Sequence, residues 1–241
     1  MKKQYSFEKS VIFFLIITIV STFVFVNISC DIFIEKVVEK KEIENTGFEE
    51  IIDLPEPKIK GEMSLEEAIK SRRSIRSFDE KELNLEQISQ LLWAAQGITD
   101  EKGHRSAPSA GALYPLEIYV VKKDGAYHYI PEGHKLEMIL KEDIRKKLSD
   151  VCLGQKWVEE APVDIIITVI YERTTVKYGE RGIRYVHLEA GHACQNILLQ
   201  SVSLGLGAVP VGAFHDREVQ EILNLEENNI PFFVIPIGYK E

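Results

Sequence analysis

The chain has 241 residues, a formal net charge of −9 at pH 7 and 45% hydrophobic residues. The acidic balance gives no support to a nucleic-acid partner, which usually requires a basic patch, and the hydrophobic content is that of a globular protein with a full core. Three cysteines (Cys30, Cys152 and Cys194) fit neither a disulfide framework nor a zinc-ligand spacing, and the six histidines form no metal-binding motif.

The N-terminus has the features of a membrane-directing segment. Lys2, Lys3 and Lys9 precede an apolar run at residues 11–26, in which Thr and Ser are the only polar members. That order is typical of secretory signals and signal anchors. A buried core helix is the alternative, but such a helix usually has a polar face. Because the lysines favour an N-terminus inside, we expect the following domain to be membrane-anchored on the extracytoplasmic side.

The residues around Cys30 leave the mode of attachment open. Cys30 stands where a lipoprotein signal is cut and lipidated, and Ser29 resembles a bacterial lipobox, whereas Asn27 occupies a usually aliphatic position. A plain anchor helix and a lipoprotein are equally good interpretations. Charges and isolated apolar residues then alternate in a predicted tether. The predicted organisation is residues 1–30 as signal peptide or signal anchor, 31–60 as tether, and 61–241 as one folded domain.

Two capped helices are predicted at the start of the folded part. Ser64 and Glu67 form a capping-box pattern that begins a helix ending near Ser71. Asn84 begins a second helix, which Gly97 ends.

A basic segment lies between these helices and contains Arg72, Arg73, Ser74 and Arg76. Arginine forks suit a phosphate, and a serine hydroxyl adds a further hydrogen bond. The alternative is that basic residues complement the C-terminus of the first helix. That alternative accounts for Arg72 and Arg73 better than it accounts for Arg76.

A run of small residues lies between Pro108 and Pro115. The two prolines forbid a regular helix between them, and the small side chains leave backbone that a flat ligand can approach closely. Residues 116–121 follow as a predicted strand. A tight connection that needs small residues only for packing is the alternative interpretation.

The rest of the chain alternates strands and helices. The predicted elements are a strand at 126–130, a helix at 136–153, a strand at 163–171 buried on both faces, a polar loop at 173–184, a long helix from about 182 to 204, a second run of small residues at 205–214, a short helix capped by Asp216, and a last strand at 231–238.

Three separated segments together resemble the FMN-dependent nitroreductase superfamily. They are Arg-Arg-Ser-Ile-Arg-Ser-Phe at 72–78, Pro-Ser-Ala-Gly-Ala-Leu-Tyr-Pro at 108–115, and Gly-Leu-Gly-Ala-Val-Pro-Val-Gly-Ala-Phe at 205–214. Residues 184–196 look like the SagB-type dehydrogenase branch, which is related to azoline oxidases. The resemblance covers residues 61–241. It implies an α+β fold, with a central antiparallel sheet flanked by helices, and a homodimer with two FMN sites at its interface.

The resemblance also implies roles for individual residues. The match to the segment that holds the FMN phosphate, ribityl chain and ring carbonyl edge consists of Arg72, Arg73, Ser74 and Arg76. The match to the loop that lies against the flavin ring from the partner subunit consists of Pro108, Ser109, Ala110 and Gly111. Gly212 and Ala213 match the backbone that faces flavin N5. Ala112 departs from the Asn of many members, and two residues follow Tyr239 where many members have an arm exchanged with the partner.

The implied function is an FMN-dependent oxidoreductase that moves a hydride or electrons between a donor such as NAD(P)H and a small organic acceptor. In the SagB-type azoline oxidases a Lys-Tyr pair is associated with proton removal, and Lys177 and Tyr178 stand at the matching place as candidate catalytic residues. A solvated loop lysine and a packed tyrosine are the alternative. The alternative functions are a membrane-tethered flavin- or ligand-binding protein of the same fold without turnover, and a structural lipoprotein without a cofactor.

Overall fold

The computed structural model describes residues 50–241. The predicted signal segment, Cys30 and the tether up to residue 49 lie outside the described residues. Within residues 50–241, no helix is both long enough and apolar enough to cross a membrane.

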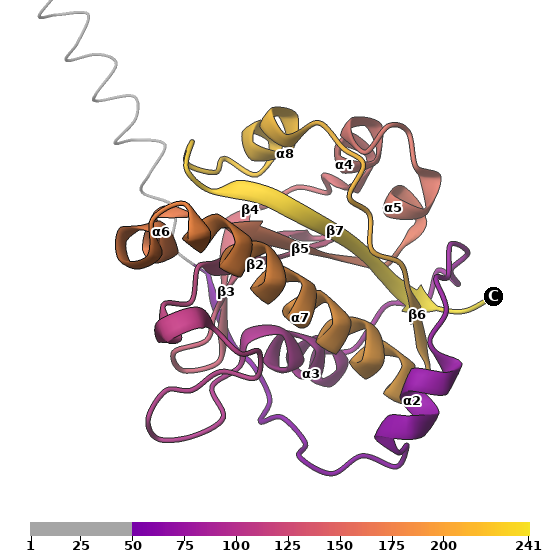
Figure 1. The fold of residues 1–241 in the computed structure, drawn as a ribbon. Helices are drawn as coiled ribbons and strands as arrows, with labels where there is room; N and C mark the ends of the chain where they lie inside the picture. The colour runs from indigo at the N-terminus through magenta and orange to yellow at the C-terminus, as the bar shows by residue number, and fades with distance from the viewer. Residues whose placement is uncertain (1–49) are drawn as a thin grey trace, which may run out of the picture. The chain divides into compact units, whose positions relative to one another are not determined.

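A seven-stranded sheet is the centre of the described domain (Figure 1). Its strand order is β1-β4-β3-β2-β5-β7-β6, and every neighbouring pair is antiparallel. The strands are β1 (Ile51–Asp53), β2 (Leu116–Lys122), β3 (Gly125–Ile130), β4 (Lys135–Leu140), β5 (Val163–Val169), β6 (Leu206–Ala208) and β7 (Ile230–Tyr239). The predicted α+β fold with a central antiparallel sheet is therefore confirmed.

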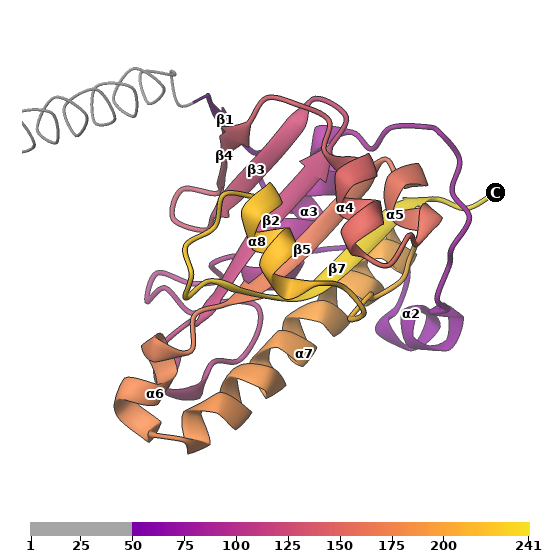
Figure 2. The same cartoon turned by 90° about the horizontal axis from the view of Figure 1, so that it is seen from above.

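Helices cover both faces of this sheet (Figure 2). One face packs against α3 (Leu85–Gln96) and α7 (Arg181–Ser203), and the other packs against α4 (Arg145–Val151), α5 (Lys156–Glu160) and α8 (Asp216–Ile222). The remaining helical segments are α2 (Leu65–Ser71), the 3₁₀ turn η1 (Ala110–Ala112) and α6 (Glu172–Tyr178).

Strand β5 divides two hydrophobic cores. Successive side chains of a strand point to opposite faces, so Ile165 and Ile167 join the core beneath α3 and α7, while Ile166 joins the core beneath α4 and α8. All seven residues of β5 are buried, including Asp164 and Thr168, as the near-continuous apolar run predicted. Each fully buried Ile contributes about 1.5–3 kcal/mol relative to an exposed one, so the centre of the sheet is a rigid support for the loops at its ends.

The predicted helix caps are confirmed at α2 and α3. Ser64 accepts a hydrogen bond from the Glu67 N–H at 3.2 Å, and the Glu67 carboxylate accepts one from the Ser64 N–H at 2.9 Å. Asn84 and Gln87 make the same reciprocal pair at the start of α3. At α8 the N-cap is His215 and not Asp216, and no side chain caps that helix.

The sequence predicts one helix at residues 136–153, and this prediction is wrong. Lys135–Leu140 is β4, which pairs with β1 and β3, and α4 begins only at Arg145. The strand forms because Leu136 and Met138 alternate onto the core face while two neighbouring strands take up the backbone hydrogen bonds. The prediction failed because a short apolar run fits either period.

The predicted tether also overlaps the folded domain. Ile51–Asp53 is the edge strand β1, and Leu54 is buried, with its N–H donating to the His134 carbonyl at 3.0 Å. Lys58 N–H donates to Gln90 Oε1 at 2.8 Å. The folded domain therefore begins before the predicted boundary at Gly61.

The predicted polar loop at 173–184 contains helix α6. Gly179, with φ of 57°, ends this helix and donates its N–H to the Thr175 carbonyl at 2.7 Å. Glycine adopts this left-handed conformation without steric cost. Lys177 and Tyr178 are thus held on the last turn of a helix, although the sequence predicts that they lie in a loop.

Candidate functional site

The basic segment 72–76 begins at the C-terminus of α2. Arg73 donates from Nη1 to the Lys70 and Arg72 carbonyls at 3.0 and 2.7 Å, so its guanidinium satisfies carbonyls at the helix end. Arg72 is half-buried, whereas Arg73 and Arg76 are exposed. The alternative interpretation, a basic complement to the helix end, therefore fits Arg73.

This basic segment lies beside the second run of small residues. Ser74 and Ala208 form a parallel bridge, and the Ile75 N–H donates to the Ala208 carbonyl at 3.1 Å. A Cβ on Gly207 would lie 2.7 Å from Ile75 Cβ, which explains why glycine is needed at this crossing. The sheet edge thus brings together two of the three predicted segments, which are more than 130 residues apart in the chain.

Gly212 and Ala213 are exposed next to this crossing. A Cβ on Gly212 would meet no atom within 4 Å, so the backbone there is open to a ligand. Gln155 Nε2 donates to the Ala213 carbonyl at 3.0 Å and fixes that peptide. We call the residues Arg72–Arg76 together with Gly212–Ala213 the arginine end.

The arginine end has an uncompensated positive charge. Within residues 50–241, none of the ion pairs involves Arg72, Arg73 or Arg76. Arg76 lies over the ring of Trp157, with Cζ 5.5 Å from the ring centroid. Trp157 Nε1 is buried and has no hydrogen-bond partner in the part of the chain that the structure describes. An anionic ligand with acceptor oxygens would compensate the charge of these guanidinium groups.

The loop at 108–114 is folded tightly. Gly111, Ala112 and Tyr114 all have positive φ, at 67°, 52° and 47°. Ser109 holds this conformation, since its Oγ accepts from the Tyr114 N–H at 2.9 Å and its carbonyl accepts from the Ala112 N–H at 3.1 Å. Positive φ in two non-glycine residues is strained backbone, which proteins retain mainly at functional sites.

Lys177 and Tyr178 of α6 meet this loop. A Cβ on Gly111 would lie 2.9 Å from Lys177 Nζ and 2.8 Å from Tyr178 Oη. The Tyr178 ring packs edge-on against Tyr185 of α7, with centroids 5.2 Å apart. The structure therefore brings the predicted catalytic pair against the predicted loop, although they are more than 60 residues apart in sequence.

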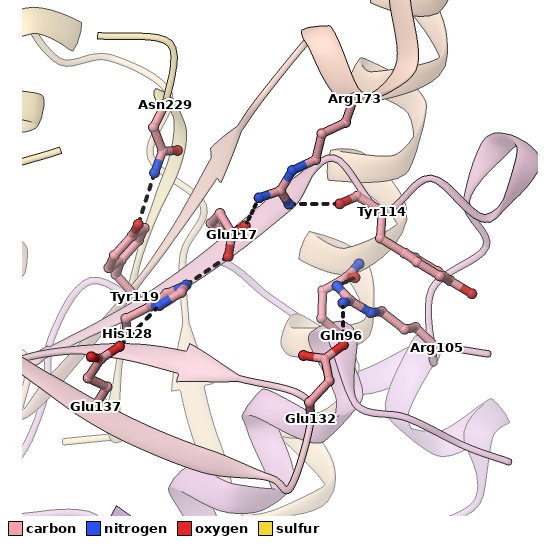
Figure 3. A network of polar contacts seen from close by, with 10 residues as sticks. All are labelled: Gln96, Arg105, Tyr114, Glu117, Tyr119, His128, Glu132, Glu137, Arg173 and Asn229. Carbon is pink, nitrogen blue, oxygen red and sulfur yellow. Dashed lines mark hydrogen bonds and ion pairs between the residues drawn. The ribbon is translucent and has the colours of Figure 1, made fainter. Parts of the chain in front are cut away.

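A polar network holds α6 and the loop together (Figure 3). Arg173 of α6 pairs with Glu117 of β2 and donates to the Tyr114 carbonyl at 3.1 Å. His128 Nε2 lies 2.7 Å from the other Glu117 oxygen, and Glu137 lies beyond His128. Burial opposes ionisation of Glu117, but the His128 hydrogen bond and the charge of Arg173 together hold its pKa below the ordinary value. Glu117 is therefore a stable anion that anchors Arg173.

Arg105 fixes the other side of the loop. Its guanidinium lies over the Tyr114 ring, 4.5 Å from the centroid, and donates to Gln96 of α3 at 3.1 Å and to Glu132 at 3.2 Å. Two arginines thus clamp the loop from opposite sides, which fixes its position on the end of the sheet.

Glu189 is a residue of this region that the sequence analysis did not single out. It lies on α7, is 2% exposed, and its Oε1 has no hydrogen-bond partner among the described residues. Burial raises its pKa to about 7, against the lowering effects of the Ser109 hydroxyl and the Arg105 charge. A lone carboxylate beside Ala190 and Gly191 was the signal that could have identified it. We call Pro108–Gly111, Lys177, Tyr178 and Glu189 the loop end.

The arginine end and the loop end are not brought together within one chain. Helix α7 has 23 residues, which corresponds to a length of roughly 34 Å. Figures 1 and 2 show α2 and β6 at its C-terminal end and α6 at its N-terminal end. Each end is assembled from distant segments, but the predicted residues form two separate groups.

The arginine end fits an FMN phosphate on the chemistry of its donors. Guanidinium groups without a carboxylate partner among the described residues lie on the same segment as Ser74, and the backbone at Gly212 is open to a ligand. The described residues contain no cluster of His, Cys, Asp or Glu suited to a metal ion. The site therefore fits an anionic organic ligand better than a metal.

An antiparallel sheet covered by helices on both faces, with an open basic site at one edge, defines an α+β protein with a site for an anionic ligand. The profile described as the nitroreductase family matches residues 69–239, and the chain belongs to this family. Its relatives include an FMN reductase.

Several relatives sharpen this placement. A nitroreductase-family protein of Methanocaldococcus jannaschii is 47% identical over 185 residues, which cover 74% of this chain and 92% of the relative. The Bacillus subtilis FMN reductase that uses NAD(P)H is 27% identical over 72% of this chain and 64% of its own length. The Escherichia coli microcin B17-processing protein McbC is 25% identical over 65% of this chain and 62% of its own length. A nitroreductase-family crystal structure from Ralstonia eutropha superposes with a TM-score of 0.73 and 34% identity, over 81% of this chain and 92% of that one.

Proposed function

We propose that this chain is an FMN-dependent oxidoreductase that transfers a hydride or electrons from a donor such as NAD(P)H to a small organic acceptor. The observation that carries the proposal is the arginine end, where Arg72 and Arg76 have no carboxylate partner within residues 50–241. Their segment pairs with Ala208, which precedes the open backbone at Gly212. The relation to an FMN reductase supports the same cofactor.

At the arginine end, the protein supplies binding and electrostatic complementarity. Arg72, Arg73 and Arg76 would hold the phosphate by charge-assisted hydrogen bonds, with Ser74 as a further donor. The backbone at Gly212 and Ala213 would lie along the ring, where an N–H group stabilises developing negative charge. FMN, when bound, supplies the hydride and electron chemistry.

At the loop end, the protein supplies a flat surface and proton-carrying groups. Pro108–Gly111 offers almost no side-chain bulk, which leaves room for a planar ring. Lys177 and Tyr178 sit beside Gly111, and we propose that they deliver or accept the proton that accompanies reduction of the acceptor. This arrangement and the relation to McbC support membership of the SagB-type branch.

A homodimer would unite the two ends. Because they lie at opposite ends of α7, the loop end of one chain would complete the arginine end of its partner. Exposed apolar side chains support such an interface: Leu65 and Ile69 of α2 and Leu188 of α7 are each more than half exposed. Leu65 and Ile69 are four residues apart on one face of α2, and exposed apolar patches of this kind mark association sites.

The decisive experiment is an absorption spectrum of the purified protein followed by a donor and acceptor screen. An oxidoreductase is yellow, is bleached by NAD(P)H or dithionite, and is reoxidised by a nitroarene, a quinone or oxygen. A yellow protein that no donor reduces would be a binding protein of the same fold without turnover. A colourless protein that takes up no added FMN would contradict the proposal.

We further propose that the domain is attached to the membrane on its extracytoplasmic side, on the basis of the lysines and apolar run before residue 27. Fractionation with protease accessibility on spheroplasts tests this. Release or failed processing of Cys30→Ala would indicate lipidation, and unchanged behaviour would indicate an anchor helix. Full-length protein in the soluble cytoplasmic fraction would refute both.

A further inference from the structure

The turn between α4 and α5 has a strained backbone. Leu153 and Gly154 both have positive φ, at 59° and 69°, and the Leu153 side chain is exposed. An exposed leucine gains no burial energy that would offset this conformation, and proteins retain such strain mainly at functional sites. The turn places Gln155 at the start of α5, where its side chain reaches two carbonyl groups.

The Gln155 amide connects this turn to the arginine end. Its Nε2 donates to the Cys152 carbonyl at 2.7 Å and to the Ala213 carbonyl at 3.0 Å. Because carbonyls only accept, the NH₂ side of the amide must face them, and both of its protons are used. The backbone of Gln155 is held as well, since its carbonyl accepts from Ser149 Oγ at 3.0 Å. Gln155 is therefore a fixed support for the Ala213 carbonyl.

This support fixes the orientation of the peptide between Ala213 and Phe214. None of the described peptide bonds is cis, and in a planar trans peptide the C=O and N–H groups point in opposite directions. Since the Ala213 carbonyl points to Gln155, the Phe214 N–H points away from the α4–α5 turn. The next N–H, that of His215, donates to the Val151 carbonyl at 3.0 Å, so the segment is also fastened to the end of α4.

The backbone donors of this segment are unused within residues 50–241. The N–H groups of Gly212, Ala213 and Phe214 donate to no backbone or side-chain acceptor there. Gly212 and Ala213 are exposed, and Phe214 is half-buried. A donor whose direction is already fixed needs no reorganisation when an acceptor arrives. The segment is thus prepared to donate hydrogen bonds to a ligand.

We propose that Gln155 is a positioning residue that holds back the Ala213 carbonyl and thereby presents the Phe214 N–H to an acceptor atom of the FMN ring. The family resemblance implies only Gly212 and Ala213 for this backbone contact. The contact with the ring rests on the proposed function, whereas the link between Gln155 and the peptide does not.

The direct test uses the one Ala-Phe dipeptide in the chain, Ala213-Phe214. Labelling alanine with ¹³C at its carbonyl and phenylalanine with ¹⁵N gives a single carbonyl-amide correlation in the NMR spectrum of the full chain without FMN. Gln155→Glu keeps the shape of the side chain but removes both donors, and Gln155→Met removes them without adding charge. In both variants the Ala213 carbonyl resonance should move upfield, because it loses a hydrogen bond.

The matched control is Gln220→Glu. Gln220 Nε2 also donates to backbone carbonyls, those of Glu226, Glu227 and Asn229, at 3.0–3.2 Å. This variant should leave the Ala213 resonance in place. A resonance that stays in place in both Gln155 variants, or that Gln220→Glu moves as far, would overturn the inference.

A second measurement tests the ligand side with FMN itself. Saturating FMN should move the Phe214 N–H signal in the parent and in Gln220→Glu, but not in the two Gln155 variants. FMN affinity, measured by flavin fluorescence, should fall about fivefold in both Gln155 variants, which is the effect of one neutral hydrogen bond. A parental Phe214 signal that bound FMN does not move would overturn the inference. Absence of FMN binding would instead contradict the proposed function and leave the carbonyl measurement standing.

Discussion

The two ends of helix α7 differ in how the charges around them are compensated. The arginine end gathers positive charge without countercharge: Arg72 and Arg76 find no carboxylate within the described residues. The polar network that holds the loop end in place balances its charges internally, since Glu117 neutralises Arg173 and Glu132 pairs with Arg105.

This difference indicates a division of labour. Basic side chains without countercharge destabilise the fold little only when they are exposed to water. Binding of an anion to them is favourable. A clamped loop with positive φ values has its ordering entropy removed in advance, so it can position a ligand accurately. We infer that the arginine end supplies affinity and the loop end supplies geometry and proton control.

The largest expected effect is at Gly111. Gly111→Phe forces a side chain into a left-handed backbone, at a cost of about 1–2 kcal/mol, and into the space beside Lys177 Nζ and Tyr178 Oη. We expect FMN binding to fall below detection in a fluorescence titration. The matched control is Gly103→Phe, where φ is also positive, at 79°, but no atom lies within 4 Å; it should lose stability only. Equal FMN binding in the two variants would remove the loop from the site.

At the opposite end, Arg72→Ala should weaken FMN binding at least tenfold. A hydrogen bond to a charged group contributes about 1.5–3 kcal/mol, and the phosphate would be left undercompensated. Arg217→Ala is the control, because the one ion pair of that exposed arginine of α8 within the described residues is with Glu221. FMN retained through gel filtration equally by both variants would refute the assignment of the arginine end.

The buried carboxyl of the loop end should make stability depend on pH. The folded pKa of Glu189, about 7, lies above that of an unfolded glutamate, so its contribution is fully present in acid and is lost as the pH rises through 7. Glu189→Gln stays neutral at every pH. The difference between its free energy of unfolding and that of the parent should therefore rise in favour of the variant by about 2 kcal/mol from about pH 5 to about pH 8. Urea denaturation at both values measures this. A gain of the same size at both pH values would show that Glu189 does not titrate in this range.

The smallest effect is expected at the proton-carrying pair. Lys177→Met and Tyr178→Phe should keep their FMN and slow one half-reaction by more than about twofold, or about 0.4 kcal/mol. Lys123→Met, an exposed lysine of the β2–β3 turn, is the control. If both half-reactions stay within twofold of the parent for every working donor and acceptor, neither residue is catalytic.

Much of the fold was predictable because local signals agreed with tertiary packing. The capping residues Ser64 and Asn84 predicted the starts of their helices, and the largely apolar sequence of β5 predicted a strand buried on both faces. Strand β4 was missed because its identity depends on pairing with β1 and β3, which lie elsewhere in the chain. Helix α6 was predicted as a polar loop because the partner of Arg173, Glu117, lies on a strand that is distant in the sequence.

Sequence motifs predicted which segments belong to the candidate site, but they did not predict the contacts between those segments. Lys177 and Gly111 could be named from their segments, but their contact depends on the Arg173 anchor. Glu189 lies within the segment 184–196 that resembles the SagB-type branch, but that resemblance assigned it no role. Its burial and its missing hydrogen-bond partner exist only once α7 packs beneath the loop.

The central claim, that two chains share each site, is tested most directly by mixing Arg72→Ala and Gly111→Phe chains. Neither variant alone should be loaded at a chosen FMN concentration, but a mixed dimer contains one site with an intact arginine end from one chain and an intact loop end from the other. With random pairing, the mixture should regain about a quarter of the parental FMN content. No regain of FMN in dimers shown to be mixed would mean that each chain builds its site alone, and would contradict the account.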